Sequence, residues 1–218
     1  RQRQMCIRDR FLYFSKKALP IIVSAVLLLS LGTVLFYRSA SSLPKERLII
    51  FFYQTNVPSA SASKWAQGLM DSSPEIKYAE AQCYTAMENA GYMDMQSGWT
   101  YITARLAKNE GDLLFLPQSQ FDFMLEKGWL APLERERFGA FEGALSNPDG
   151  EIMGLDITGM GFKGLEFPCA QKPDNALRPL EGEKLIACVY CHASDLTLAK
   201  NTLFEILDGA VFLGGENE

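Results

Sequence analysis

The stretch Asp112–Leu133, DLLFLPQSQFDFMLEKGWLAPL, constrains the fold of this chain more than any other. Leu113–Leu116 is an uninterrupted apolar run, which is typical of a strand covered on both faces, and Pro117 ends it. A short amphipathic helix follows, and Gly128 is placed for the left-handed residue that ends many helices. The stretch therefore contains one complete strand-and-helix unit and predicts an α/β fold.

The same alternation of strands and helices continues on both sides of this unit. Strands that alternate with helices are usually joined by right-handed crossovers and lie parallel to one another. The sequence thus predicts a three-layer α/β domain, with a mostly parallel sheet and helices on both of its faces. The predicted strands are Leu48–Tyr53, Glu75–Cys83, Leu113–Leu116, Glu151–Ile157 and Lys184–His192. The predicted helices are Ser63–Asp71, Thr85–Asn109, the helix before Gly128, and Asp195–Asp208. The second of these helices is expected to break near Gly91 or Gly98, and Ser194 is expected to cap the last.

An apolar segment near the N-terminus, Ala18–Tyr37, contains no charged residue and is long enough to cross a bilayer, which takes ~20 residues. Lys16 and Lys17 precede it and only Arg38 follows closely, so the positive-inside rule favours a cytoplasmic N-terminus. The alternative is a cleaved signal peptide with Ser39–Ser42 as its small-residue region, but the apolar run exceeds the ~7–15 residues of a signal-peptide core. Both interpretations export the rest of the chain. The first predicts a signal anchor and a single-pass protein of the cell membrane.

The first ten residues, RQRQMCIRDR, have no apolar periodicity. They match the in-frame translation of a transposase-based sequencing adapter, and we leave them out of the fold prediction. Without their four arginines and one aspartate the net charge changes from −5 to −8. No cluster of Lys and Arg then remains outside the membrane flank, so nucleic acid is not an expected partner.

These features predict five parts along the chain. The last part is large enough for one hydrophobic core but too small for two full lobes. The parts are an adapter-derived segment (1–10), a short cytoplasmic flank (11–17), a transmembrane helix (18–37), a polar linker (38–47) and an extracytoplasmic α/β domain (48–218).

Polar side chains follow three predicted strands at the points where these strands end. In open α/β sheets, ligands bind beyond the carboxyl ends of the strands, so these side chains are candidates for a ligand-binding edge. Amides, hydroxyls and an aromatic ring suit a small polar solute such as a sugar or a peptide. Ordinary loop polarity is the alternative interpretation. The candidate residues are Gln54, Thr55, Asn56, Tyr84, Thr85, Gln118 and Gln120.

The motif CVYCH, from Cys188 to Cys191 and His192, matches the C-x-x-C-H pattern of covalent haem attachment. A strand, C-x-x-C and a helix is also the order of a thioredoxin-like redox site. However, the motif lies in an apolar stretch predicted as a strand, where residues three apart are ~10 Å from each other and cannot form a disulfide. Cys169 could reach either cysteine. We favour buried free thiols and predict no cofactor and no metal.

No constellation of residues identifies a reaction. A single histidine in a helix-cap region supports no Ser/His/Asp arrangement, and the acidic stretches Glu134–Glu142 and Gly215–Glu218 are simply explained as solvated surface. Gly159, Gly161 and Gly164 lack the lysine and the strong helix of a phosphate-binding loop. The sequence therefore predicts a protein that is not an enzyme.

Three stretches resemble the bacterial extracellular solute-binding proteins of ABC importers, which have the type II periplasmic-binding fold. They are the first strand with its helix, then Ile102–Leu133, and finally Leu185–Leu207. In the family the middle stretch reads as a helix, a Gly-Asp turn, a strand, and a helix that ends in Gly-hydrophobic-Leu-x-Pro-Leu. The last stretch resembles the returning strand and its Ser-capped helix, which packs on the first lobe. These motifs indicate the fold and do not identify a site.

The resemblance implies a solute-binding role, with ABC permease subunits and a small polar solute as partners. Family members insert a second lobe where this chain has only residues 134–183, which predicts a short, one-lobed and membrane-anchored relative. The expected function is non-enzymatic solute binding outside the cytoplasm. The alternatives are an extracytoplasmic interaction domain that has lost ligand binding, and a haem or thiol redox protein that uses Cys188, Cys191 and His192.

Overall fold

The computed structural model describes residues 23–24, 26–30, 46–84, 92–165 and 183–212. The chain forms two compact units, Arg1–Leu43 and Pro44–Glu218. In the first unit, residues 23–24 and 26–30 are helical. Most of the predicted transmembrane segment, 18–37, lies outside the described residues, and within those that are described no helix has the length and apolarity needed to span a membrane.

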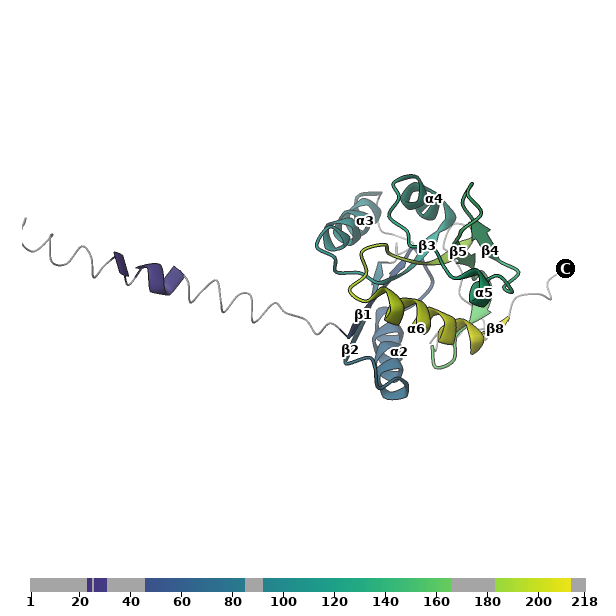
Figure 1. Ribbon diagram of the computed structural model, residues 1–218, viewed down its shortest axis with the longest axis horizontal. Coiled ribbons are helices and arrows are strands. Elements are labelled where there is room, and N and C mark those ends of the chain that lie inside the picture. Colours follow the sequence, from purple (N-terminus) through teal and green to yellow (C-terminus); the bar gives the residue numbers. More distant parts are fainter. Residues whose placement is uncertain (1–22, 25, 31–45, 85–91, 166–182, 213–218) are drawn as a thin grey trace, which may run out of the picture. The chain divides into compact units, whose positions relative to one another are not determined.

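The second unit is built on a six-stranded sheet with the order β2-β1-β3-β7-β5-β4 (Figure 1). Two further short strands, β6 (Met160–Gly161) and β8 (Val211–Phe212), form a separate pair. The strands of the main sheet are β1 (Arg47–Tyr53), β2 (Tyr78–Tyr84), β3 (Leu113–Pro117), β4 (Ala144–Ser146), β5 (Ile152–Asp156) and β7 (Leu185–Val189).

The direction of β7 makes this sheet mixed. β1 pairs in parallel with β2 and β3, whereas β7 is antiparallel to both of its neighbours, β3 and β5, and β4 is antiparallel to β5. The prediction of an α/β domain is confirmed, but that of a mostly parallel sheet is wrong. An apolar run such as Leu185–Val189 shows that a strand is buried on both faces and carries no information on the direction in which it runs.

Helices cover both faces of the sheet, as predicted. On one face, a core cluster joins the apolar side chains of β1, β3 and β7 to those of α2 (Ser59–Ser72) and α6 (Leu196–Asp208). On the other face lie α3 (Tyr92–Leu106) and α4 (Gln118–Glu126) (Figure 1). Burying a large apolar side chain stabilises the folded state by roughly 1.5–3 kcal/mol, so the two helix layers hold β1 and β3 firmly between them.

The unit that begins at Asp112 folds largely as its sequence predicts. β3 leads directly into α4, and Gly128, with φ of 68°, provides the left-handed residue beyond the helix. The backbone N–H of Trp129 then donates to the carbonyl oxygen of Met124 at 3.0 Å and closes the last turn. These signals are local, which explains why the sequence reveals them.

Three helix details differ from the prediction. α2 begins at Ser59 after an extended Pro58, so Ser63 lies inside the helix and is not its cap. α3 continues through Gly98 without a break there, and the alternative break, near Gly91, lies outside the described residues. A Cβ atom at Gly98 would lie 3.2 Å from the Cβ of Tyr84, so glycine at this position allows α3 to pack closely on β2. The cap of α6 is Asp195, whose carboxylate accepts a hydrogen bond from the Leu198 N–H at 3.0 Å. The sequence also gave no signal for α5 (Arg135–Phe138), β4, β6 or β8.

Candidate functional site

The carboxyl ends of β1, β2 and β3 meet at one edge of the sheet. In the strand register Tyr53 lies beside Tyr84, and the backbone N–H of Gln54 donates to the Tyr84 carbonyl oxygen at 2.8 Å. Gln118 directly follows Pro117, the last residue of β3. The predicted polar residues that the structure describes are therefore brought, from three separate stretches, to the same edge, which we call the rim.

Gln54 has an unusual backbone conformation. Its φ is 50°, in the left-handed region that residues with a side chain rarely adopt, and only 8% of the residue is exposed. Such a conformation costs about 1–2 kcal/mol and persists only where the surrounding structure imposes it. Residues under this kind of strain are concentrated at functional sites. Gln54 is thus the residue of the rim with the strongest structural indication of a role.

The other predicted residues are placed in different ways. Thr55 is fully buried, and its hydroxyl oxygen accepts a hydrogen bond from the Val57 N–H at 3.4 Å, so its side chain is not offered to a solute in this conformation. Asn56 is exposed, and Gln120 is half-buried in the first turn of α4. Thr85 lies outside the described residues.

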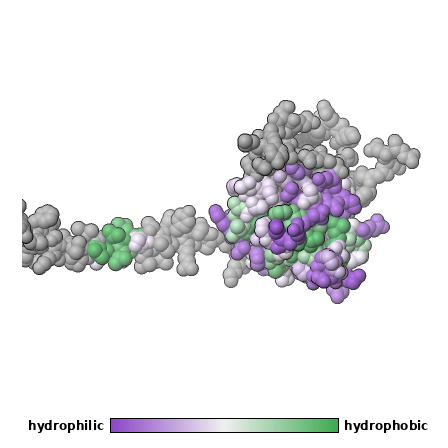
Figure 2. All heavy atoms as spheres, turned by 90° about the horizontal axis from the view of Figure 1, so that it is seen from above, coloured by the Kyte–Doolittle hydropathy of each residue, from purple (hydrophilic) through white to green (hydrophobic). Residues whose placement is uncertain are grey.

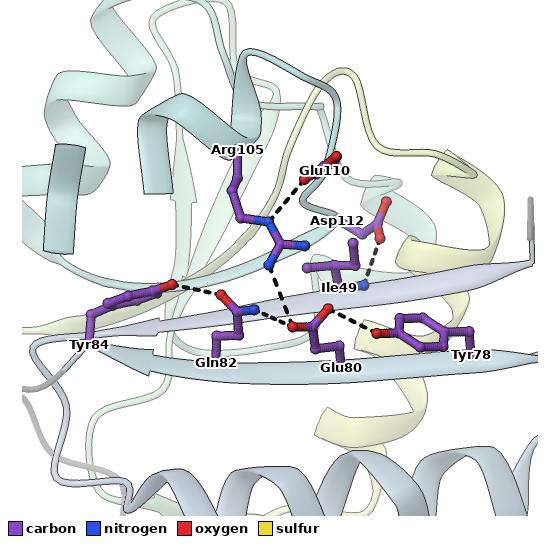
Figure 3. A network of polar contacts seen from close by, with 8 residues as sticks. All are labelled: Ile49, Tyr78, Glu80, Gln82, Tyr84, Arg105, Glu110 and Asp112. Atoms are coloured by element: carbon purple, nitrogen blue, oxygen red, sulfur yellow. Dashed lines mark hydrogen bonds and ion pairs between the residues drawn. The ribbon is translucent and has the colours of Figure 1, made fainter. Parts of the chain in front are cut away.

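Tyr84 belongs to a row of polar side chains along β2, drawn in Figure 3. Its hydroxyl donates to Oε1 of Gln82 at 2.6 Å, and the amide of Gln82 donates to Glu80. Tyr78 donates to the other oxygen of Glu80 at 3.1 Å, so the four residues form a continuous chain on one face of the strand. Burial raises the pKa of Tyr84, which keeps its hydroxyl protonated and able to donate.

Arg105 connects this row to the segment before β3 (Figure 3). It lies 3.5 Å from Glu80 and 3.1 Å from Glu110. Burial alone would raise the pKa of Glu80, but hydrogen bonds from Gln82 and Arg105 and the charge of the guanidinium hold it below its usual value. Glu80 therefore stays ionised, and the row is a structural network that reaches the rim only through Tyr84.

Four rim residues were missed by the sequence analysis. Glu183 and Lys184 were missed because β7 runs opposite to the expected direction, whereas Asp156 and Thr158 lie at the carboxyl end of β5, which was predicted as a strand and runs parallel to β3. The start of β7 lies at the rim, where the Lys184 carbonyl oxygen accepts from the Gln118 N–H at 2.9 Å. The ammonium of Lys184 lies 3.0 Å from Asp156 at the end of β5. The missed residues are Asp156, Thr158, Glu183 and Lys184.

Asp156 and Thr158 fix the end of β5 to the start of β7. The hydroxyl oxygen of Thr158 accepts from the Leu185 N–H at 2.8 Å, and the Thr158 N–H donates to Asp156 at 3.1 Å. Burial would raise the pKa of Asp156, but the hydrogen bonds from Thr158 and the ammonium of Lys184 lower it below its usual value. Asp156 and Lys184 are thus a charged pair at the rim.

Aromatic rings cover the α3 and α4 side of the sheet. The ring of Trp99 lies 5.3 Å from that of Tyr53 and 6.3 Å from that of Phe123, which in turn lies 6.1 Å from Trp129. Phe123 and Tyr101 are the most exposed of the large apolar residues described on these two helices. Figure 2 shows hydrophobic and hydrophilic side chains interspersed on the face of this unit seen from above.

The cysteines of the CVYCH motif do not form one dithiol site. Cys188 is fully buried in β7, with its thiol 3.7 Å from the Leu114 carbonyl oxygen, and burial raises its pKa. Cys191 packs against the core cluster that contains Ala187 and Val189, whereas alternation along the strand places Cys188 on the opposite face. Both are free thiols, as is Cys83, whose pKa burial raises to about 12.

The remaining metal and haem candidates receive no geometric support. His192 is exposed, and its ring lies 5.7 Å from that of Tyr190. Cys169 lies outside the described residues. Among the residues that are described, no group of three or more His, Cys, Asp and Glu side chains could hold a metal ion.

No family model and no curated protein matches the chain. Iron-bound HitA from Pseudomonas aeruginosa is similar in structure with a TM-score of 0.36 and 17% identity, over 53% of this chain and 33% of that one. A cyclo/maltodextrin-binding protein complexed with maltotetraose is similar with a TM-score of 0.38 and 17% identity, over 56% of this chain and 31% of that one. The chain thus spans about a third of the length of each. A likeness at this level assigns neither a ligand nor an activity.

Proposed function

We propose that the protein binds a small polar solute at the rim, on an extracytoplasmic domain tethered by an N-terminal membrane helix, and that it catalyses no reaction. The observation that carries the proposal is the strained backbone of Gln54 at the carboxyl end of β1. Amide side chains from Gln54 and Gln118 can each donate and accept hydrogen bonds, which suits hydroxyl and peptide groups. The carboxyl edge is also where open α/β sheets bind their ligands.

The composition of the first unit supports the membrane tether. Five of its seven described helical residues are apolar, and Leu27, Leu28 and Leu29 are each more than half accessible. They are drawn largely in the hydrophobic colour in Figure 2. Exposed leucines of this kind are stable in lipid and costly in water. Together with Lys16 and Lys17 before the segment, they favour a membrane helix with a cytoplasmic N-terminus.

The resemblance of Ile102–Leu133 and Leu185–Leu207 to solute-binding proteins supports an association with the permease subunits of an ABC importer. This part of the proposal depends on those sequence motifs. A pull-down of the full chain from native membranes, followed by identification of co-purifying permease subunits, tests it.

A thermal-shift measurement on the full chain in mild detergent tests solute binding. Wild-type protein is compared with and without millimolar disaccharide, dipeptide or amino acid. A ligand at 100 times its Kd adds ~2.7 kcal/mol to the free energy of unfolding, so one of these solutes should raise Tm by several degrees. The double variant Gln54→Ala and Gln118→Ala should lose this response.

The matched control is Gln67→Ala, which removes an exposed amide from α2, away from the rim. It should respond to the solute as the wild type does. If no solute stabilises the wild-type protein, the proposal is wrong, and an interaction domain that has lost ligand binding becomes the better interpretation.

A further inference from the structure

The N-terminus of α4 has no cap of its own. The residue before the helix is Pro117, whose side chain makes no capping hydrogen bond, and the first turn contains no acidic residue. The free N–H groups and the dipole at such an end favour a negative charge. This end lies at the rim, because Gln118 is its first residue.

Glu183 supplies the missing negative charge from a distant part of the sequence. One of its carboxylate oxygens accepts a hydrogen bond from the Ser119 N–H at 3.0 Å. The neighbouring backbone holds it in place, since the Lys184 carbonyl oxygen accepts from the Gln118 N–H at 2.9 Å. The carboxylate therefore occupies the position that an anionic group of a bound solute would take at this helix end.

The other charges described at the rim offer an anion no alternative. The ammonium of Lys184 lies 3.0 Å from Asp156, whose carboxylate neutralises it. The Glu183 carboxylate is therefore a negative charge that the Lys184–Asp156 pair does not neutralise. An anionic solute would have to displace this carboxylate from the Ser119 N–H and also approach a charge of its own sign.

We propose that Glu183 determines the charge class of the solute, by filling the anion-binding end of α4 and restricting the rim to uncharged or cationic polar solutes. This inference rests on the proposed function, because it names the class of solute that the same rim accepts. We therefore expect solutes with a carboxylate or phosphate group to bind poorly at this end of α4. Removing the Glu183 carboxylate should open an anion site at the Ser119 N–H.

The test uses inorganic phosphate as the probe and the full chain in mild detergent. Phosphate should leave Tm of the wild-type protein unchanged and raise that of Glu183→Ala, with at least tenfold tighter binding by titration calorimetry. Glu183→Gln loses the charge but keeps an oxygen that can accept from Ser119, so it should gain a smaller response. The matched control is Glu126→Ala, which removes an exposed carboxylate from the other end of the same helix and should gain none.

The proposal is overturned if phosphate stabilises the wild-type protein as strongly as Glu183→Ala. It is also overturned if no Glu183 variant that folds gains a phosphate response beyond that of the Glu126 control. The phosphate response of Glu183→Ala does not depend on whether the wild-type protein binds any of the uncharged solutes. A failure of the Glu183 proposal can therefore be distinguished from a failure of the proposed function.

Discussion

Ser194 donates two hydrogen bonds to a single carboxylate oxygen of Asp112, one from its backbone N–H at 2.7 Å and one from its hydroxyl at 2.9 Å. The other oxygen of Asp112 accepts from the Ile49 N–H at 2.7 Å (Figure 3). Asp112 is 1% exposed, so one buried carboxylate joins the start of β3 to β1 and to the turn before α6. Ser194 was predicted to cap α6, but it binds the Asp112 carboxylate, and Asp195 caps the helix.

Asp112→Ala should lower the free energy of unfolding by about 2–5 kcal/mol. The substitution leaves the buried Ile49 N–H and the Ser194 N–H without their acceptor, whereas the Ser194 hydroxyl can still donate to the Arg47 carbonyl oxygen. Each buried unsatisfied group costs roughly 1–3 kcal/mol, part of which water entry recovers. Urea denaturation monitored by circular dichroism measures the change. Asp122→Ala, on the exposed side of α4, is the control and should change the free energy by no more than about 0.5 kcal/mol. Equal effects of the two substitutions would contradict the structural role of Asp112.

The titration of Asp112 should make stability fall as pH rises. Burial raises the pKa of this carboxyl, although hydrogen bonds from Ile49 and Ser194 offset part of the effect. Its contribution to stability is therefore complete below the unfolded pKa of about 3.9 and is lost as pH rises through the folded pKa. The free energy of unfolding of wild-type protein minus that of Asp112→Asn should decrease from about pH 4 upward. A difference that stays constant or increases with pH would show that the pKa is not raised.

Gln54→Gly should stabilise the domain and weaken solute binding. Glycine adopts φ of 50° without strain, which recovers about 1–2 kcal/mol, while its greater freedom in the unfolded chain costs about 0.4–1 kcal/mol. A net gain of about 0–1.6 kcal/mol in the free energy of unfolding is therefore expected in urea denaturation. The control is Asn109→Gly, because Asn109 has φ of 55° but follows α3 at a distance from the rim. Asn109→Gly should leave the solute response intact, and a matching loss of response in both variants would count against a binding role for Gln54.

The native protein should show no Soret band and an unreactive thiol at Cys188. Burial raises the pKa of Cys188 and Cys191, so little thiolate is present at neutral pH, and Cys188 is also inaccessible to solvent. Thiol labelling followed by peptide mapping should modify Cys191 before Cys188, and guanidinium should make both react. A haem absorbance, or rapid labelling of both thiols in the native state, would restore the redox interpretation.

The sequence was informative where a signal is local. β3 and α4 were predicted closely because an apolar run, a proline and a glycine lie within one short segment. Gln54 and Gln118 were placed at one edge because parallel strands end together, and β1 and β3 are indeed parallel. Their role in binding remains a prediction.

The features that the sequence did not reveal depend on contacts between distant residues. The direction of β7 follows from its pairing with β3 and β5, and it brings Glu183 and Lys184 to the rim, where Lys184 pairs with Asp156 at the end of β5. Likewise, a serine before a helix is a good cap by composition, but the carboxylate that Ser194 contacts lies far away in the chain. Capping propensity cannot show whether a serine side chain bonds to its own helix or to a residue far away in the chain.

The polar row on β2 lies at one end of the sheet formed by the described strands. β2 is the first strand in the sheet order, and such a strand offers its outer backbone groups to any other extended chain. Glu80 places an ionised and partly buried carboxylate in the middle of this strand, held by Arg105. A second molecule that paired there would have to bury this charge further, at a considerable cost in desolvation. We therefore expect the residues that fix Tyr84 also to disfavour edge-to-edge pairing of this strand.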